Sequence, residues 1–209
     1  MKKAFWIICL LIFIASTSLI QAQTKSPHEQ TFTPEQLQED FKRMRTQLEQ
    51  NQPGLYEYIS KPDLNSYLDS LQATLNKPMT SLEFLNLVRP ILIKIRNGHN
   101  NVYASKAMAN YARSKGKFLP LEVVWLKDGL YVKDVYTTKS GLPKGSKITS
   151  INGRAIQDIL SNLLRYAAPD GYNETFPRRR VYRNFSIAYY WYIAQTDVFQ
   201  VTYQAAGQS

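Results

Sequence analysis

The stretch GLPKGSKITSING, residues 141–153, decides the fold expected for the second half of this chain. Its Gly-Leu-Pro-Lys-Gly segment favours turns, the β-branched run Lys147 to Ile151 is typical of a strand, and Asn152-Gly153 supplies a second tight turn. A helix is expected over Arg154 to Tyr166, where apolar residues recur at helical spacing. The stretch therefore predicts a strand-turn-helix unit.

Strand and helix patterns on both sides extend this unit into a small domain. Phe118 to Trp125 and Leu130 to Tyr136 are separated by a Lys-Asp-Gly turn, which predicts an antiparallel hairpin. Phe176 to Gln195 is an aromatic-rich helical stretch, and Val198 to Tyr203 is expected to close the sheet. Residues 116–204 are thus predicted to form one domain with a small antiparallel sheet and flanking helices.

Three amphipathic helices with short breaks are predicted earlier in the chain. The first begins at the capping box Thr33 to Gln36, and the third begins at the capping box Thr80 to Glu83. Pro90 is expected to kink the third helix, because proline has no N–H and its ring crowds the preceding turn. The apolar faces must bury against one another, so residues 32–103 are predicted to form a helical N-terminal domain. The predicted fold class is α+β.

Residues 1–22 have the organisation of a secretory signal peptide. A Lys-Lys pair precedes a continuous apolar segment over residues 4–14, and small residues lead to a cleavage site after Ala22. The alternative is an uncleaved membrane anchor, because the apolar stretch approaches the lower limit of roughly 17 residues for a spanning helix. A polar linker, residues 23–31, follows. The chain is expected to be exported to the periplasm or cell envelope, or secreted.

Composition excludes several classes of site. The single cysteine, Cys9, lies in the leader, so no thiol chemistry is expected in the mature chain. His28 and His99 are far apart and give no zinc-ligand spacing, and no Gly-rich phosphate loop occurs. Neither a metal nor a cofactor is predicted. The formal net charge of +10 would suit nucleic acid, but the export signal argues against that partner.

Several short runs give the chain a family resemblance. They are NQPGLY (51–56), IRNGH (95–99), LPL (119–121) and GSKITSING (145–153), in that order behind the leader. Together they resemble the N-terminal half of tail-specific, or C-terminal processing, serine peptidases, in which a helical segment precedes a PDZ-like domain. The resemblance implies proteolysis in a longer protein, with the nucleophilic serine and its partners in a downstream α/β domain. The sequence given, which ends at Ser209, contains no motif for that nucleophile.

We therefore expect the chain to be the N-terminal substrate-recognition portion of an exported peptidase, inactive by itself. The alternatives are a non-enzymatic envelope adaptor that binds peptides or a partner protein, and a purely structural interaction domain. Expected partners are peptides or protein C-termini and a downstream or separate catalytic domain, with a membrane only if the leader stays uncleaved. The basic run Arg178 to Arg180 is either a solvated helix start or a contact for an anionic envelope surface or partner domain.

A PDZ-like domain would bind a peptide end as an added strand. The binding strand would be Leu121 to Trp125, backbone N–H groups of the loop Gly116 to Pro120 would hold the terminal carboxylate, and the helix Arg154 to Tyr166 would line the side-chain pocket. Pro120 weakens carboxylate capture because it has no N–H to donate. The predicted peptide-binding residues are Gly116, Phe118, Leu119, Leu121, Val123, Ile156, Ile159, Leu160 and Leu163.

His99 is the candidate catalytic residue. It follows the expected helix end at Asn97-Gly98 and precedes an apparent strand, Asn101 to Tyr103, at the junction of the two predicted domains. In the tricorn-like branch of the family, a histidine in an Asp-x-His context is the base for the downstream serine. Here Asn97 stands where that acidic residue would be. The alternative is a junction histidine that hydrogen-bonds a backbone carbonyl and orders the turn.

Overall fold

The computed structural model describes residues 26–138 and 141–206, and the fold is α+β, as the sequence predicts. The leader predicted over residues 1–22, including Cys9, lies outside the described residues. In chain order the elements are β1 (Thr31–Phe32), α1 (Pro34–Asn51), α2 (Lys61–Ala73), β2 (Met79–Thr80), α3 (Ser81–Val88), α4 (Ile91–Ile95), α5 (Lys106–Lys115), β3 (Leu121–Leu126), β4 (Gly129–Val135), β5 (Lys147–Ile151), β6 (Arg154–Ala155), α6 (Ile156–Leu164), α7 (Thr175–Arg183), α8 (Phe185–Tyr192) and β7 (Val201–Gln204).

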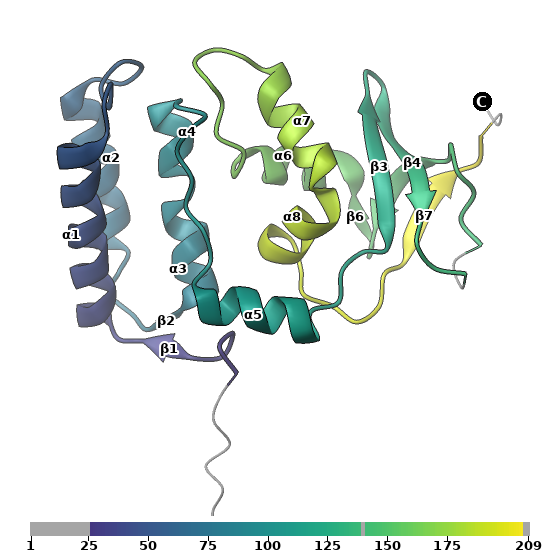
Figure 1. The fold of residues 1–209 in the computed structure, drawn as a ribbon, viewed down its shortest axis with the longest axis horizontal. Coiled ribbons are helices and arrows are strands. Elements are labelled where there is room, and N and C mark those ends of the chain that lie inside the picture. Colours follow the sequence, from purple (N-terminus) through teal and green to yellow (C-terminus); the bar gives the residue numbers. More distant parts are fainter. Residues whose placement is uncertain (1–25, 139–140, 207–209) are drawn as a thin grey trace, which may run out of the picture.

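The molecule is built from a helical part and a sheet part. The helical part, β1 to α4, stands at one end, and the sheet of β3 to β7 stands at the other (Figure 1). Helices α6 to α8 lie between them, and we count them with the sheet part. Helix α5 runs along one side of the molecule and connects the two parts. Within the described ranges, no helix combines the length and the apolar character needed to cross a membrane.

Both predicted capping boxes are present in the helical part. The Thr33 hydroxyl accepts the N–H of Gln36 at 3.4 Å, while the Gln36 side chain accepts the N–H of Thr33 at 3.0 Å. Thr80 and Glu83 make the same reciprocal pair at the start of α3. The predicted kink at Pro90 is a break between α3 and α4, because proline cannot donate the hydrogen bond that would continue the helix.

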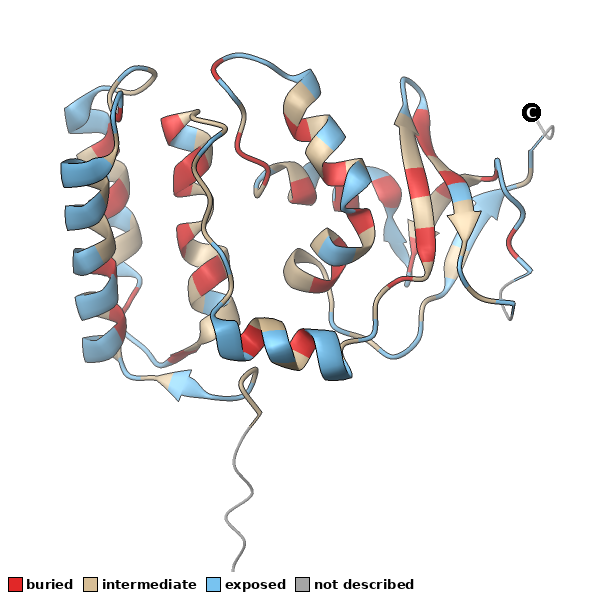
Figure 2. Cartoon of the chain, in the orientation of Figure 1, coloured by how far each residue is buried: buried red, intermediate tan, exposed pale blue. Residues whose placement is uncertain are grey.

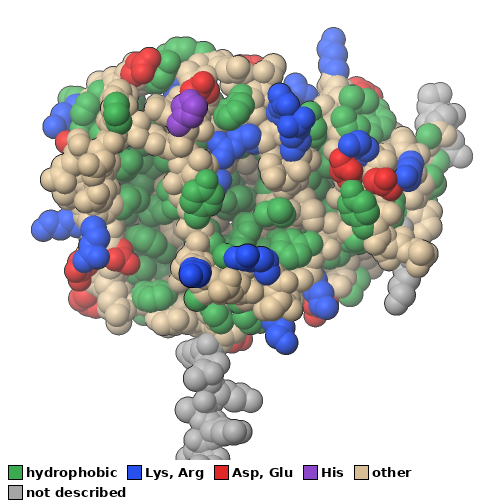
Figure 3. All heavy atoms as spheres, in the orientation of Figure 1, with side chains coloured by type: hydrophobic (Ala, Val, Ile, Leu, Met, Phe, Trp, Pro, Cys, Tyr) green, Lys and Arg blue, Asp and Glu red, His purple; other side chains and the backbone are tan. Residues whose placement is uncertain are grey.

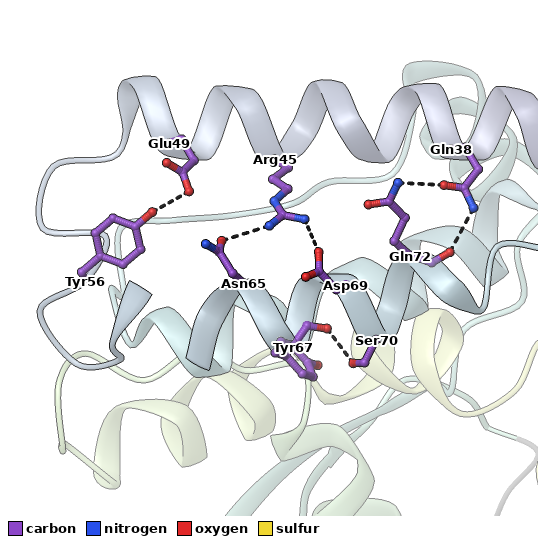
Figure 4. Close-up of polar contacts among 9 residues, drawn as sticks. All are labelled: Gln38, Arg45, Glu49, Tyr56, Asn65, Tyr67, Asp69, Ser70 and Gln72. Atoms are coloured by element: carbon purple, nitrogen blue, oxygen red, sulfur yellow. Dashed lines mark hydrogen bonds and ion pairs between the residues drawn. The ribbon is translucent and has the colours of Figure 1, made fainter. Parts of the chain in front are cut away.

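A line of polar side chains joins α1 to α2 (Figure 4). The Gln38 side chain donates to the Gln72 carbonyl oxygen at 3.0 Å and accepts from the Gln72 side chain at 2.9 Å. Arg45 donates to the carboxylate of Asp69 at 2.5 Å and to the amide oxygen of Asn65 at 3.1 Å. These bonds lie beside the apolar face and fix how far α1 is shifted along α2.

The segment between the two parts differs from the sequence prediction. Helix α5 was not expected, although Ser105 caps it and Met108 and Ala112 bury its inner face. The strand expected over Asn101 to Tyr103 is not formed. The carbonyl oxygen of Val102 accepts a hydrogen bond from an arginine side chain instead of a strand partner, so the segment stays extended without joining a sheet.

The sheet part contains the predicted antiparallel hairpin. Strands β3 and β4 pair from Leu121 opposite Val135 to Leu126 opposite Gly129, with a bulge after Glu122. The strand order is β3-β4-β5-β6, and β7 also pairs with β5, antiparallel, outside this order. The helical stretch expected over residues 176–195 is two helices, because the chain turns away from helical geometry at Asn184, where φ is −119° and ψ is 24°.

Two separate clusters of buried apolar side chains underlie the two parts (Figure 2). The cluster of the helical part gathers residues from α1 to α4 around Phe41 and Ile95, both 0% exposed, and also takes Ala168 from the sheet part. The cluster of the sheet part gathers residues from β3 to α8 around Ile148 and Ile159. The domain boundaries predicted from the sequence stay a prediction.

Candidate functional site

The structure gathers most of the predicted peptide-binding residues, but it buries them. Leu119, Leu121 and Val123 belong to the apolar cluster of the sheet part, together with Val181 and Phe185 of α7 and α8. The four predicted residues of α6 are at most 5% exposed: Ile156, Ile159, Leu160 and Leu163. Gly116 and Phe118 are half-buried. A peptide could contact the buried members only if α7 and α8 moved, so their role in binding stays a prediction.

Helices α7 and α8 lie against β3. Arg178 of α7 donates to the carbonyl oxygen of Leu126 at 3.4 Å, and its guanidinium lies 4.7 Å from the ring centre of Trp125. Ser186 of α8 donates to the carbonyl oxygen of Leu119 at 2.6 Å. Strand β3, with which the peptide was predicted to pair, is therefore contacted at both ends by this chain's own helices. The sequence prediction of one continuous helix over residues 176–195 gave no sign of this arrangement.

The loop assigned to the terminal carboxylate offers few free donors. The N–H of Gly116 donates to the carbonyl oxygen of Ala112 at 2.8 Å, because Gly116 closes α5. The N–H of Leu121 donates to the carbonyl oxygen of Leu119 at 2.8 Å, and Pro120 has no N–H. Between Gly116 and Leu121, only the amides of residues 117–119 are left as donors for a carboxylate.

His99 lies on an exposed turn at the seam between the two parts. Its backbone N–H donates to the side-chain oxygen of Asn97 at 3.0 Å, and its carbonyl oxygen accepts from Asn101 at 3.4 Å. The N–H of Gly98 donates to a carboxylate oxygen of Asp170 at 3.3 Å, which ties the turn to the sheet part. Within residues 26–138 and 141–206, the imidazole itself makes no hydrogen bond or ion pair.

A pocket that the sequence did not indicate lies between the helical part and α6 to α8. It has a volume of about 330 Å³. Two guanidinium groups line it, those of Arg89 and Arg180, and no aspartate or glutamate does. The remaining lining is amide, aromatic and aliphatic: Leu85, Asn101, Tyr103, Ala104, Leu163, Tyr166, Ala167, Val181, Asn184, Ile187, Ala188, Trp191 and Tyr192.

The two guanidinium groups are held by neighbouring residues of one extended segment. Arg89 donates to the carbonyl oxygens of Val102 and, at 3.0 Å, Tyr166. Arg180 donates to the side-chain oxygen of Asn101 at 2.6 Å. Burial lowers the pKa of the Arg89 guanidinium, and the positive charge of Arg180 lowers that pKa further. The pocket is thus a positively charged site with partly desolvated donors.

The described residues contain no group of three or more histidine, cysteine, aspartate and glutamate side chains placed to hold a metal ion.

Comparisons with known proteins relate the chain to others only through its fold. No protein-family model matches it, and no curated protein matches it in sequence. Two solved structures of CPAF, a chlamydial tail-specific-protease-like serine protease, are similar. The structure of mature CPAF complexed with lactacystin has a TM-score of 0.60 at 14% identity, over 83% of this chain and 33% of that one. A CPAF mutant has a TM-score of 0.58 at 15% identity, over 81% and 31%. In fold, this chain therefore resembles about a third of CPAF.

Proposed function

We propose that this chain is the substrate-recognition portion of an exported serine peptidase of the tail-specific type. The observation that carries the proposal is the fold likeness to CPAF, which extends over about four-fifths of this chain. The chain spans only about a third of those solved chains, so catalysis would depend on residues beyond the ones described. The bound ligand would be the end of a peptide or protein chain.

The sheet part would serve as a PDZ-like domain in this proposal. Its support is the order of hairpin, turn, strand β5 and helix α6, with left-handed backbone at the turns. Gly145 has a φ of 81°, and Asn152 and Gly153 have φ values of 48° and 75°. Such angles are accessible to glycine and asparagine at little cost, so the turn residues quoted from the sequence are the ones that this geometry needs.

His99 would supply the base for a serine that lies outside the described residues. Its support is an exposed ring on a turn that Asn97 and Asp170 hold in place. In a longer product that cleaves peptides, His99→Gln should abolish cleavage and leave the melting temperature nearly unchanged, because the ring is not part of the packed structure. Full activity of that variant would remove His99 from the mechanism. Unfolding of the variant would instead assign the residue a structural role.

The proposal is tested by peptide binding to the purified chain without its leader. A dye-labelled peptide with an aliphatic C-terminal residue should bind with a Kd on the order of micromolar, as expected for a short peptide with few anchors. The same preparation should not hydrolyse peptides above background. Peptide hydrolysis that persists after repurification and is blocked by a serine-directed inhibitor would contradict the proposal that this portion is not catalytic. Absence of any peptide binding would favour a structural interaction domain.

A further inference from the structure

We call the cavity lined by Arg89 and Arg180, between the helical part and α6 to α8, the arginine pocket. We propose that it takes the C-terminal carboxylate of a peptide whose last side chain is aliphatic. This rests on the proposed function for the class of ligand. It places the carboxylate at side chains of the interdomain seam, and not at the backbone amides of the loop Gly116 to Pro120.

The arginine pocket holds two positive charges. The described residues form six ion pairs, and neither Arg89 nor Arg180 takes part in any of them. No acidic side chain lines the pocket, so two like charges share a partly desolvated space without a counterion from the lining. A carboxylate would relieve their repulsion and form charge-assisted hydrogen bonds with planar guanidinium donors.

Both guanidinium groups are held in place by the protein itself. Arg89 is fixed by two backbone carbonyls and lies 5.2 Å from the ring centre of Tyr192. Arg180 is fixed by Asn101. Each guanidinium has five N–H donors, so both keep donors that these contacts do not use. Side chains already held in place lose little freedom when a ligand arrives, which favours binding.

Large apolar side chains line the rest of the pocket. Beside the two arginines, Ile187 is 52% exposed and Tyr103 is 77% exposed, and both are large side chains. Leu163 and Val181 form the floor, at 1% and 3% exposed. In the space-filling view, hydrophobic and basic side chains lie together over the middle of the molecule, between the helical part and α7 (Figure 3).

The combination selects one kind of ligand. A peptide end carries an anionic group and an apolar side chain on the same residue, which matches arginines next to an aliphatic floor. The volume of about 330 Å³ lies at the lower end of the range for ligand sites, so it suits a terminal residue or two and not a long segment. Inorganic phosphate shares the charge but has no apolar part, so it should bind less tightly.

The test compares Arg180→Gln with Arg179→Gln, its exposed neighbour on α7. The probe is N-acetyl-Ala-Ala-Leu, with a free or an amidated C-terminus, titrated into the full chain by calorimetry. The unsubstituted chain should bind the free acid at least about tenfold more tightly than the amide. Arg180→Gln should remove that preference, and Arg179→Gln should keep it, although both variants lose one positive charge. A preference that survives Arg180→Gln would overturn the proposal.

A second variant protects the test against misfolding. Ile187 is half exposed, so Ile187→Glu should fold normally while placing a competing carboxylate beside the arginines. It should also remove the preference for the free acid. If inorganic phosphate bound as tightly as the free peptide, the pocket would be a general anion site, and the peptide proposal would be wrong.

The failure of the proposed function can be told apart from the failure of this inference. If the free peptide binds but Arg180 is irrelevant, the chain recognises peptides elsewhere and only the arginine pocket is refuted. If neither peptide binds, N-acetyl-leucine is added to ¹⁵N-labelled chain, and the side-chain Nε–H signals of Arg89 and Arg180 are followed. Shifts absent with N-acetyl-leucinamide would keep the pocket as a carboxylate site, and unshifted signals would refute it.

Discussion

Gly171 is a residue at which backbone geometry constrains the seam between the two parts. Its φ is 57°, its N–H donates to the carbonyl oxygen of Arg96 at 2.8 Å, and an added Cβ would lie 3.1 Å from the hydroxyl oxygen of Tyr58. Gly153 has a similar φ of 75° but open space around it. The two positions therefore separate backbone strain from steric crowding.

Alanine substitutions at these glycines give the first prediction. Gly153→Ala should lower the free energy of unfolding by about 1 kcal/mol, because alanine disfavours the left-handed conformation. Gly171→Ala should cost about 1 kcal/mol more, because Tyr58 must also shift. Urea unfolding followed by circular dichroism measures both. Equal costs at the two positions would show that the Tyr58 contact does not constrain the seam.

Arg89 gives the second prediction at this scale. Arg89→Met keeps much of the side-chain length but leaves the carbonyl oxygens of Tyr166 and Val102 without their donor. Loss of these partly buried hydrogen bonds should lower the free energy of unfolding by about 2–3 kcal/mol. Arg43→Met is the control: Arg43 makes an exposed pair with Glu39, so its loss should cost less than about 0.5 kcal/mol. Similar costs in chemical denaturation would contradict a structural role for Arg89.

At the scale of elements, the β3–β4 hairpin has an acid-sensitive surface. A hydrogen bond from Lys133 holds the pKa of Glu122 below its usual range, and Tyr136 adds to this effect. The carboxyl pKa of Asp134 is likewise lowered, chiefly by Lys144. A lowered pKa in the folded state means that the interaction stabilises the fold above the unfolded pKa and is lost as the pH falls through the folded one.

The third prediction follows from the lowered pKa values of Glu122 and Asp134. The melting temperature should fall between about pH 7 and about pH 3, and the fall should be smaller in Glu122→Gln than in the unsubstituted chain, because the variant has already lost the interaction. Glu39→Gln, which removes a carboxylate from the exposed surface of α1, is the control and should retain the original fall. An unchanged acid response in Glu122→Gln would contradict the role given to the Lys133 contact.

Elements with strong local signals are the ones that the sequence predicts well. The capping boxes at Thr33 and Thr80 and the hairpin turn at residues 127–129 depend on neighbours in the sequence, and the structure confirms them. Helix α5 has a local signal in its Ser105 cap, but its buried face holds only Met108 and Ala112, too few residues for a periodicity argument to detect. The break at Asn184 lies inside an aromatic-rich stretch that periodicity alone does not divide. The extended segment before α5 is held by arginine side chains from α7 and the α3–α4 break, a contact between distant residues.

At the scale of the whole molecule, the candidate site could be predicted only in part. The position of His99 at the junction between the two parts follows from the helix-end signal at Asn97-Gly98, although the strand expected after it is not formed. The arginine pocket could not be found in this way, because Arg89 and Arg180 are far apart in sequence and meet only when the two parts pack together. The basic run Arg178 to Arg180 was a visible signal, but its members point to different places: Arg178 lies on Trp125, and Arg180 lines the pocket.

The most direct measurement locates the bound peptide end. Isotope-filtered nuclear Overhauser spectra of ¹³C-labelled chain with unlabelled N-acetyl-Ala-Ala-Leu report which protein methyl groups lie next to the leucine side chain of the ligand. We predict contacts from that leucine to the methyl groups of Val181 and Ile187, which line the arginine pocket. Contacts to Leu119 and the ring of Phe118, or no contacts at all at saturating peptide, would contradict it.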